Sequence, residues 1–242
     1  GGGSFSTQKK VNEDEDKEQN PFRTAYDGGN LPITEGNPDI FDPATKRRLK
    51  EHIVWTLPEG FNLGHLDFEF YLPLFMAGLS IVEEPYGYLA VQGVRDLVAF
   101  GGKNHRLHVC VDALATKLKE LFKLDNPVVA RRAMVVMQQL MTCDKVTETG
   151  PEERRALASS AAGDLGVAFK EHFKGLAGGL NQCRNNMIKA GDKAATAVAE
   201  LVMETLEVME VNGGRDKEGQ AAAFGEIKPF CPDYASVTGA GA

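Results

Sequence analysis

The stretch that decides the fold runs from Leu66 to Met141 and contains RLHVCVDALATKLKELF at residues 106–122. In this segment apolar side chains recur at steps of four, three, four and three residues, at Leu107, Val111, Leu114, Leu118 and Leu121. That spacing places them on one face of a helix with about 3.6 residues per turn. The segment is therefore predicted to be an amphipathic α-helix with a buried apolar face.

Two further helix patterns flank this segment, and both begin at a proline. Pro85 begins PYGYLAVQGVRDLVAFGG (residues 85–102), in which the apolar pattern stops at Gly101 and Gly102. Pro127 begins PVVARRAMVVMQQLM (127–141) directly after the capping residue Asn126. The two prolines lie 42 residues apart (127 − 85), within the roughly 40–47-residue period of HEAT and armadillo repeats. The stretch is interpreted as two proline-started helical pairs in tandem.

A helix pair with one apolar face cannot bury that face alone and must stack on a neighbouring pair. The predicted fold is therefore all-α, a HEAT/armadillo-like α-solenoid with extended, non-helical N- and C-terminal arms. The alternative is an irregular all-helical domain in which the proline spacing is a coincidence.

The same residues carry a resemblance to a known family. LDFEFYLPLFMAGL (66–79), the Pro85 segment and VVMQQLM (135–141) resemble the parkin co-regulated family, and the likeness extends to FRTAYDGGNLPI (22–33), Trp55 and IKPFCPDYASV (227–237). The chain departs from the family at Phe100, where a histidine is common, and over residues 156–191, which match poorly.

The resemblance implies a role in cilia and flagella. Members of this family are helical-repeat microtubule inner proteins, located at the inner junction of axonemal doublets, where the B-tubule meets the A-tubule. The expected partners are α/β-tubulin, a neighbouring β-rich junction protein and other axonemal proteins, and the expected location is the cytoskeleton of the cytoplasm and the axoneme. The alternative is a soluble cytosolic adaptor or chaperone-like scaffold in flagellar assembly.

Composition limits the other function classes. The chain has 242 residues, 43% hydrophobic and 25% charged, with a net charge of −7, which is ordinary for a soluble globular protein. Nucleic-acid binding is not expected, because it usually requires basic stripes that neutralise phosphates. No uninterrupted apolar run approaches the length of a membrane span, so no membrane partner is expected. The four cysteines form no C-x-x-C pair, which favours buried, reduced thiols.

Four regions are predicted along the chain. Residues 1–20 form an acidic tail with few apolar groups, which is expected to be disordered on its own. Residues 21–64 contain closely spaced turn signals rather than helix and form an extended wrapping arm, with a short basic helix from Pro43 to about His52. Residues 65–214 form the helical-repeat body, and residues 215–242 form an extended C-terminal segment, read as a return strand over 224–237.

The second half of the body is less regular. A helix is expected to start near Thr149–Glu153 and to present a weak stripe, weakened by glycines, at Leu157, Ala161, Leu165, Ala168, His172 and Leu176. The next helix has its apolar face at Ala194, Val198, Leu201, Thr205 and Val208. Its glutamates are expected outside that face, at Glu200, Glu204, Glu207 and Glu210. Asn212-Gly213-Gly214 is suited to a left-handed cap at its end.

Candidate partner-binding residues follow from charge and aromaticity. The densest basic cluster comprises Lys46, Arg47, Arg48 and Lys50, close to the only tryptophan, Trp55. An aromatic beside basic residues suits a binding hot spot, although solvated helix surface and a buried anchor for the arm remain alternatives. Further candidates are Arg131, Arg132 and the family-divergent Phe100.

Catalytic and metal chemistry is not expected. His105 and His108 are three residues apart but lack acidic or cysteine ligands in the same turn, and Lys103 and Arg106 make the site electropositive. A nucleophilic pair of His172 and Cys183 lacks an orienting Asp or Asn pattern. The chain is therefore predicted to be neither an enzyme nor a holder of a cofactor or metal.

Overall fold

The computed structural model describes residues 20–36, 53–145 and 164–239. Its body consists of α3 (Phe68–Gly78), α4 (Tyr86–Lys103), α5 (Val111–Phe122), α6 (Pro127–Leu140), α9 (Phe173–Ala190) and α10 (Lys193–Asn212). Shorter helical elements are η1 (Leu63–His65), η2 (His108–Cys110), α8 (Asp164–Ala168) and η3 (Phe169–His172). The N-terminal elements are α2 (Pro21–Asp27), β1 (Ile33–Glu35) and β2 (Ile53–Trp55), and the C-terminal element is α11 (Ala222–Ile227).

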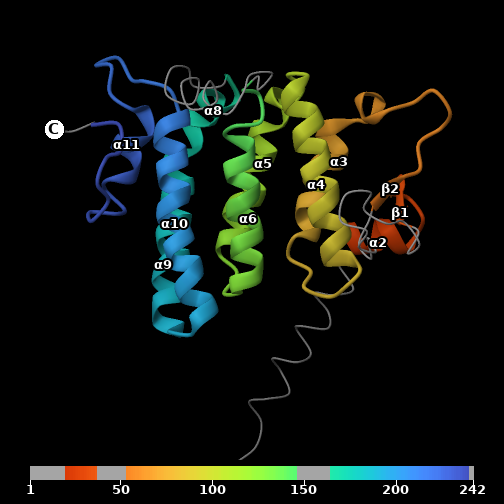
Figure 1. The fold of residues 1–242 in the computed structure, drawn as a ribbon, viewed down its shortest axis with the longest axis horizontal. Coiled ribbons are helices and arrows are strands. Elements are labelled where there is room, and N and C mark those ends of the chain that lie inside the picture. The colour runs from red at the N-terminus through yellow and green to blue at the C-terminus, as the bar shows by residue number, and fades with distance from the viewer. Residues whose placement is uncertain (1–19, 37–52, 146–163, 240–242) are drawn as a thin grey trace, which may run out of the picture.

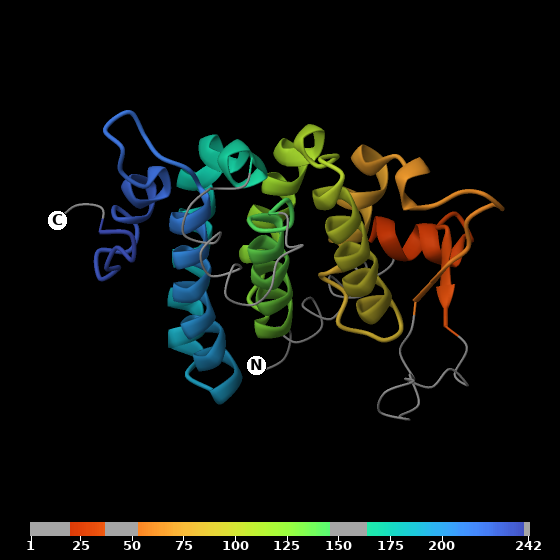
Figure 2. The same ribbon diagram turned by 45° about the horizontal axis from the view of Figure 1, so that its top comes forward.

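The body helices form three stacked pairs in two layers. Successive helices pack as α3 with α4, α5 with α6 and α9 with α10. Along the stack, α3, α5 and α9 contact one another in order, as do α4, α6 and α10 in the second layer. Figures 1 and 2 show α4, α6 and α10 side by side, with α2 and the strands at one end and α11 at the other. The prediction of an all-α, solenoid-like fold is confirmed.

The apolar positions from Leu107 to Leu121, from which the helical fold was predicted, lie in the hydrophobic core. Leu107, Val111, Leu114, Leu118 and Leu121 are all buried. The predicted apolar positions of the Pro127 segment are buried as well, at Ala130, Met134 and Met137 in α6 and at Met141 directly after it. Because α5 contacts α3, α6 and α9, its apolar face joins both layers and neighbouring pairs.

The helices are paired differently from the prediction, in which each proline started the first helix of a pair. Pro85 and Pro127 begin α4 and α6, which are the second helices of their pairs and belong to the same layer. Asn126 caps α6, since its Oδ1 accepts hydrogen bonds from the amides of Val128 at 2.9 Å and Val129 at 3.3 Å. The 42-residue spacing therefore separates equivalent helices, but the first helix of each pair lies upstream of its proline.

The predicted end of the first helix at Gly101-Gly102 is wrong, because α4 continues through both glycines to Lys103. A Cβ at position 101 would lie 2.5 Å from Leu107 Cδ2, and one at position 102 would lie 2.4 Å from Cys143 Sγ. Both distances are shorter than real Cβ contacts allow. The two glycines therefore permit close packing inside a helix rather than ending it.

The N-terminal arm contains a helix where turns were expected. Asn20 Oδ1 accepts a hydrogen bond from the amide of Phe22 at 3.0 Å, and Pro21 occupies the first turn, so α2 has a capped start. Phe22 is fully buried, and its ring lies 5.2 Å from that of Phe75 on α3. β1 and β2 then pair antiparallel, with Ile33 opposite Trp55. The arm is thus anchored on the first helical pair.

The C-terminal segment also differs from its prediction. The expected return strand over 224–237 is wrong in its first part, because residues 222–227 form α11, which packs against α9 and α10. The apolar face of α10 is rotated relative to the predicted one: Ala195, Val198, Val202 and Thr205 are buried, whereas Ala194 is exposed. At the end of α10 the left-handed residue is Gly214, with a φ of 75°.

Three predictions fall outside the described residues. They concern the acidic tail over 1–19, the basic helix over 43–52 and the helix start at 149–153 with its apolar positions at Leu157 and Ala161. Among the described helices, none is both long enough and apolar enough to cross a membrane.

Candidate partner-binding surfaces

Trp55 anchors the β1–β2 hairpin on the solenoid. Its Nε1 donates a hydrogen bond of 2.8 Å to Asp96 Oδ2 on α4, and its ring lies 5.6 Å from that of Phe75 on α3. The side chain is half-buried. Of the two interpretations left open by the sequence, the structure supports the anchor, because the polar atom and much of the ring are already used within the chain.

A second set of contacts joins α2 to the start of α4. Arg23 forms an ion pair of 2.9 Å with Glu83, and its guanidinium lies 4.6 Å from the centre of the Tyr86 ring. The hydroxyl of Tyr86 donates a hydrogen bond of 2.8 Å to Asp27 Oδ1. The arm and the first pair are thereby held together by polar as well as apolar contacts.

Phe100 lies beside an exposed aromatic site at one end of the solenoid. It is half-buried, its ring lies 6.4 Å from that of Phe68, and it packs against Gly64 in η1. Next to η1, Phe61 is 54% exposed, with its ring 4.7 Å from that of His65. Phe100 therefore supports η1, whereas the accessible aromatic ring next to η1 is that of Phe61, which the sequence patterns did not single out.

The two adjacent arginines of α6 have different environments. Arg132 Nη1 donates hydrogen bonds to the carbonyl oxygens of Ile81 at 2.6 Å and Leu79 at 3.4 Å, and its side chain is only 16% exposed. Arg131 is exposed and lies in a groove between α6 and α10. Arg132 therefore tethers the α3–α4 connection, and Arg131 is the one of the two that a partner can reach.

The cluster of Lys46, Arg47, Arg48 and Lys50 lies outside the described residues. It belongs to the connection between β1 and β2, whose ends are held together by the pairing of Glu35 with Ile53. The role of this cluster in binding stays a prediction.

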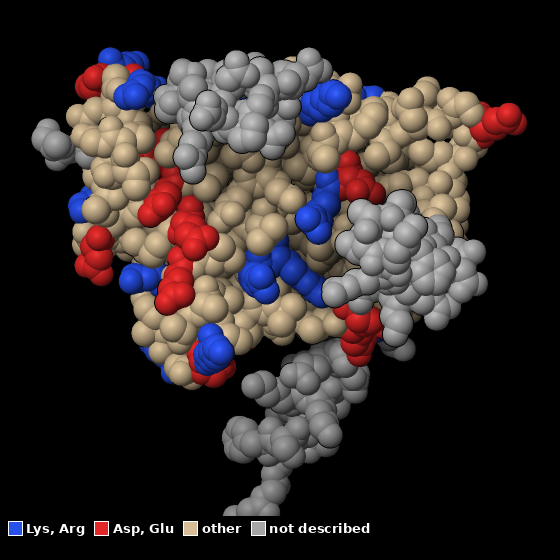
Figure 3. All heavy atoms as spheres, in the orientation of Figure 1, with Lys and Arg blue, Asp and Glu red and all other residues tan. Residues whose placement is uncertain are grey.

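Charge is unevenly distributed on the face formed by α4, α6 and α10. Figure 3 shows acidic side chains gathered over α10, and basic side chains over α6 and α4 beside it. The exposed acidic residues of α10 include Glu200, Glu204 and Glu207. This face consequently offers two regions of opposite sign to partners.

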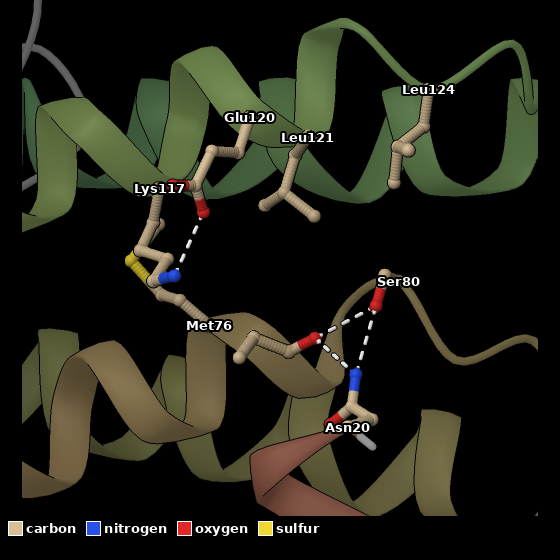
Figure 4. Close-up of a pocket in the computed structure, with 8 residues that line it drawn as sticks. Asn20, Met76, Ser80, Lys117, Glu120, Leu121 and Leu124 are labelled. Atoms are coloured by element: carbon tan, nitrogen blue, oxygen red, sulfur yellow. Dashed lines mark hydrogen bonds and ion pairs between the residues drawn. The ribbon is translucent and has the colours of Figure 1, made fainter. Parts of the chain in front are cut away.

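A small pocket of about 220 Å³ lies between α3 and α5 where α2 begins. Figure 4 shows Asn20 pointing to Ser80, with hydrogen bonds of 3.1 Å from Asn20 Nδ2 to both Ser80 Oγ and the Ala77 carbonyl. Lys117 and Glu120 form an ion pair of 2.8 Å on the opposite side. The polar groups of this pocket thus already have partners. The pocket is the place where the N-terminal arm attaches to the first helical pair.

The thiols have the properties of structural rather than reactive cysteines. All four cysteines are unpaired, and burial raises the pKa of Cys110 and Cys183 to about 11 and that of Cys143 to about 12. These thiols are protonated at neutral pH and are poor nucleophiles. His172, which the sequence analysis considered as a partner of Cys183, has its Nε2 atom 2.9 Å from Oδ1 of Asp112 on α5. Within the described ranges, no group of three or more His, Cys, Asp or Glu side chains is placed to hold a metal ion.

Glu210 differs most from its predicted environment. It was expected on the outer face of α10 but is only 1% exposed. Its carboxylate accepts hydrogen bonds from the hydroxyls of Tyr234, Ser236 and Thr238 and from the amides of Val237 and Thr238. Because these donors lie 24 to 28 residues downstream, helical periodicity gave no signal for them.

These features define the chain as an α-solenoid, a class whose stacked repeats present extended surfaces to other macromolecules. A family model described as Parkin co-regulated protein matches residues 20–150, which is more than half of the chain. A Mus musculus protein, Parkin coregulated gene protein homolog, is 25% identical over 226 residues, covering 89% of this chain and 76% of the mouse protein. The chain therefore belongs to the parkin co-regulated protein family.

Proposed function

We propose that this protein is a structural component of ciliary and flagellar doublet microtubules. At the inner junction it binds α/β-tubulin and a neighbouring junction protein, and so helps to join the B-tubule to the A-tubule. Its location is then the axoneme, within the cytoskeleton. The mechanism is static surface complementarity with no chemical step.

The observation that carries this proposal is that a chain of the parkin co-regulated family forms a solenoid with two opposite helix layers. Joining two walls requires a protein that binds on two sides at once. On one layer, Phe70 of α3 is 58% exposed, and on the other, Val128 and Arg131 of α6 are exposed. Both layers thus have accessible side chains that lie outside the buried core.

Repetition supports the proposal energetically. Along a microtubule, each copy binds next to its neighbours, so each weak contact acts at a high effective concentration. Tubulin and this chain are both acidic, and the net charge here is −7, so their long-range interaction is repulsive. Local basic groups must offset this repulsion, and the Lys46–Lys50 cluster is the candidate.

The test is retention of the tagged chain on isolated doublets after detergent extraction and then washes of increasing salt. A structural junction protein stays with the doublets through detergent and moderate salt. An unrelated tagged helical protein of similar size, which should leave with the detergent, serves as the control. Release of this chain with detergent alone would contradict the proposal and favour the cytosolic adaptor.

A further inference from the structure

The groove between α6 and α10 is the larger of the two hollows described, with a volume of about 450 Å³. Its lining includes Val128 and Arg131 from the first turns of α6, and Val198, Leu201, Glu200 and Glu204 from α10. That volume lies within the range of roughly 300–1,000 Å³ found for ligand pockets. We call it the α6–α10 groove.

The floor of the α6–α10 groove is apolar and accessible. Val128 is 44% exposed, Leu201 is half-buried, and Val198 is buried beneath them. The groove therefore offers aliphatic surface to solvent at the start of α6 and in the first half of α10.

One wall of the groove carries an acidic stripe. Glu200 and Glu204 line the groove, and Glu207 lies beyond its lining on the same face of α10. All three glutamates are exposed, four and three residues apart. Within the described residues, no ion pair links them to a cation. The only basic residue of α10 itself is Lys193, seven positions before Glu200. Like charges at this spacing destabilise a helix, so the stripe does not serve the stability of α10.

The walls of the groove determine the kind of ligand. Extended peptides gain much of their affinity by adding a strand to a sheet edge. The backbone groups of α6 and α10 are already used within these helices, so an extended chain finds no such edge here. A helix, by contrast, can lay side chains between two parallel ridges. Its side chains at i, i+4 and i+7 have the same spacing as Glu200, Glu204 and Glu207.

We propose that the α6–α10 groove binds an amphipathic helix of a partner protein. The helix inserts aliphatic side chains against Val128, Val198 and Leu201, and sets Lys or Arg side chains at i, i+4 and i+7 against the acidic stripe. This binding depends only on the geometry and charge of the groove and does not require attachment to microtubules. The three glutamates of the acidic stripe outnumber the single basic residue of the lining, Arg131, so the groove repels acidic tubulin surfaces and its occupant is a basic partner.

The test uses the full chain and a labelled synthetic helical peptide of leucine, lysine and alanine, with leucines and lysines on adjacent faces. A second peptide has the same composition with the leucines scattered around the helix. Fluorescence anisotropy should show binding of the first peptide and much weaker binding of the second. Failure of the amphipathic peptide to bind, or equal binding of both peptides, would overturn the proposal.

Two triple variants test whether peptide binding depends on the glutamates beside the groove or on the negative charge of the whole protein. Changing Glu200, Glu204 and Glu207 to Gln should weaken peptide binding about tenfold or more. Changing the exposed Glu59, Glu171 and Glu218 to Gln removes the same charge elsewhere and should leave affinity within about twofold. Equal losses in the two variants would contradict a local site. The first variant should also melt no lower than wild type, because it removes repulsion between like charges.

A variant of the floor tests the apolar half of the proposal. Val128→Ser alters an exposed residue in the first turn of α6, next to the capping Asn126, whose side chain remains. Binding of the amphipathic peptide should weaken several-fold while helical content stays unchanged. Unaltered affinity would show that the peptide is held by charge alone, and the docking model would be wrong.

Discussion

The hydroxyl of Tyr234 donates a hydrogen bond of 2.7 Å to Oε2 of Glu210, and both side chains are 1% exposed. This contact joins the C-terminal segment to the last helix of the solenoid. The terminal repeats of a solenoid lack one neighbour and need a cap. Together with α11, the segment held by Glu210 covers α9 and α10 and provides that cap.

Glu210→Gln should therefore destabilise the C-terminal cap. A glutamine offers fewer acceptor sites than a carboxylate to the five donors around it, and leaving buried donors unsatisfied costs about 1–3 kcal/mol. Thermal unfolding should shift downward, and hydrogen exchange should accelerate first in residues 222–239. Tyr234→Phe removes one donor and keeps the ring, so it should cost less. Equal exchange rates in wild type and Glu210→Gln would contradict the capping role.

The same carboxylate should make stability depend on pH. Burial by itself raises the pKa of Glu210, but hydrogen bonds from Ser236, Thr238, Tyr234 and the Val237 amide outweigh it, so the pKa is lowered from its ordinary 4.5. A lowered folded-state pKa means that the stabilisation is present above pH 4.5 and is lost as the pH falls through the lower folded value. The difference in melting temperature between wild type and Glu210→Gln should thus be constant near neutrality and shrink in acid.

Leu114→Asp should unfold the body. Leu114 is fully buried in α5, the helix that contacts both layers, and an unpaired buried carboxylate costs several kcal/mol. Ala113→Asp, at the neighbouring exposed position of the same helix, is the matched control and should melt within a few degrees of wild type. Circular dichroism on heating compares the two, and similar melting of both variants would argue against the buried stripe.

The two arginines of α6 should respond differently to alanine. Arg132→Ala leaves the Ile81 carbonyl without its donor and should cost about 1–3 kcal/mol of folding free energy. Arg131→Ala, at an exposed position, should change it by no more than about 0.5 kcal/mol. Chemical denaturation of the two variants measures this difference. A larger effect of Arg131→Ala on stability would reverse their assigned roles.

The basic cluster should contribute to attachment through charge. Exposed ion pairs are worth about 0.2–1 kcal/mol each and are screened by salt, so a single change should do little. Changing Lys46, Arg47 and Arg48 together to Glu should leave helical content unchanged, yet the variant should leave doublets at lower salt than wild type. The same salt resistance as wild type would show that the cluster is solvated surface.

Local periodicity predicted the parts of the fold that depend on one helix. The stripe from Leu107 to Leu121 is buried as expected because burial of an amphipathic helix follows its own spacing. The pairing of helices was harder: Pro85 and Pro127 mark helix starts, but which neighbour each helix packs against is a tertiary property. Gly101-Gly102 looked like a stop because glycine disfavours helix locally, whereas close contacts with Leu107 and Cys143 favour it there.

Among the candidate partner-binding residues, the sequence predicted correctly only those whose exposure to solvent depends on their position on a helix. Arg131 is accessible as expected, but its neighbour Arg132 is held by a carbonyl 51 residues upstream, and no local pattern shows that. Trp55 was left open between hot spot and anchor, and its contact with Asp96, 41 residues away, makes it an anchor. Glu210 was predicted to lie outside the apolar face because of its position on the helix, and its donors come from a segment expected to be a strand.

The proposed junction role can be tested by a density map of intact doublet microtubules, compared between cells that make this protein and cells that lack it. We expect density at the inner junction that fits the two-layered solenoid of α3 to α10 and disappears when the protein is absent. Inner-junction density that is unchanged by its loss would contradict the structural role proposed for this chain.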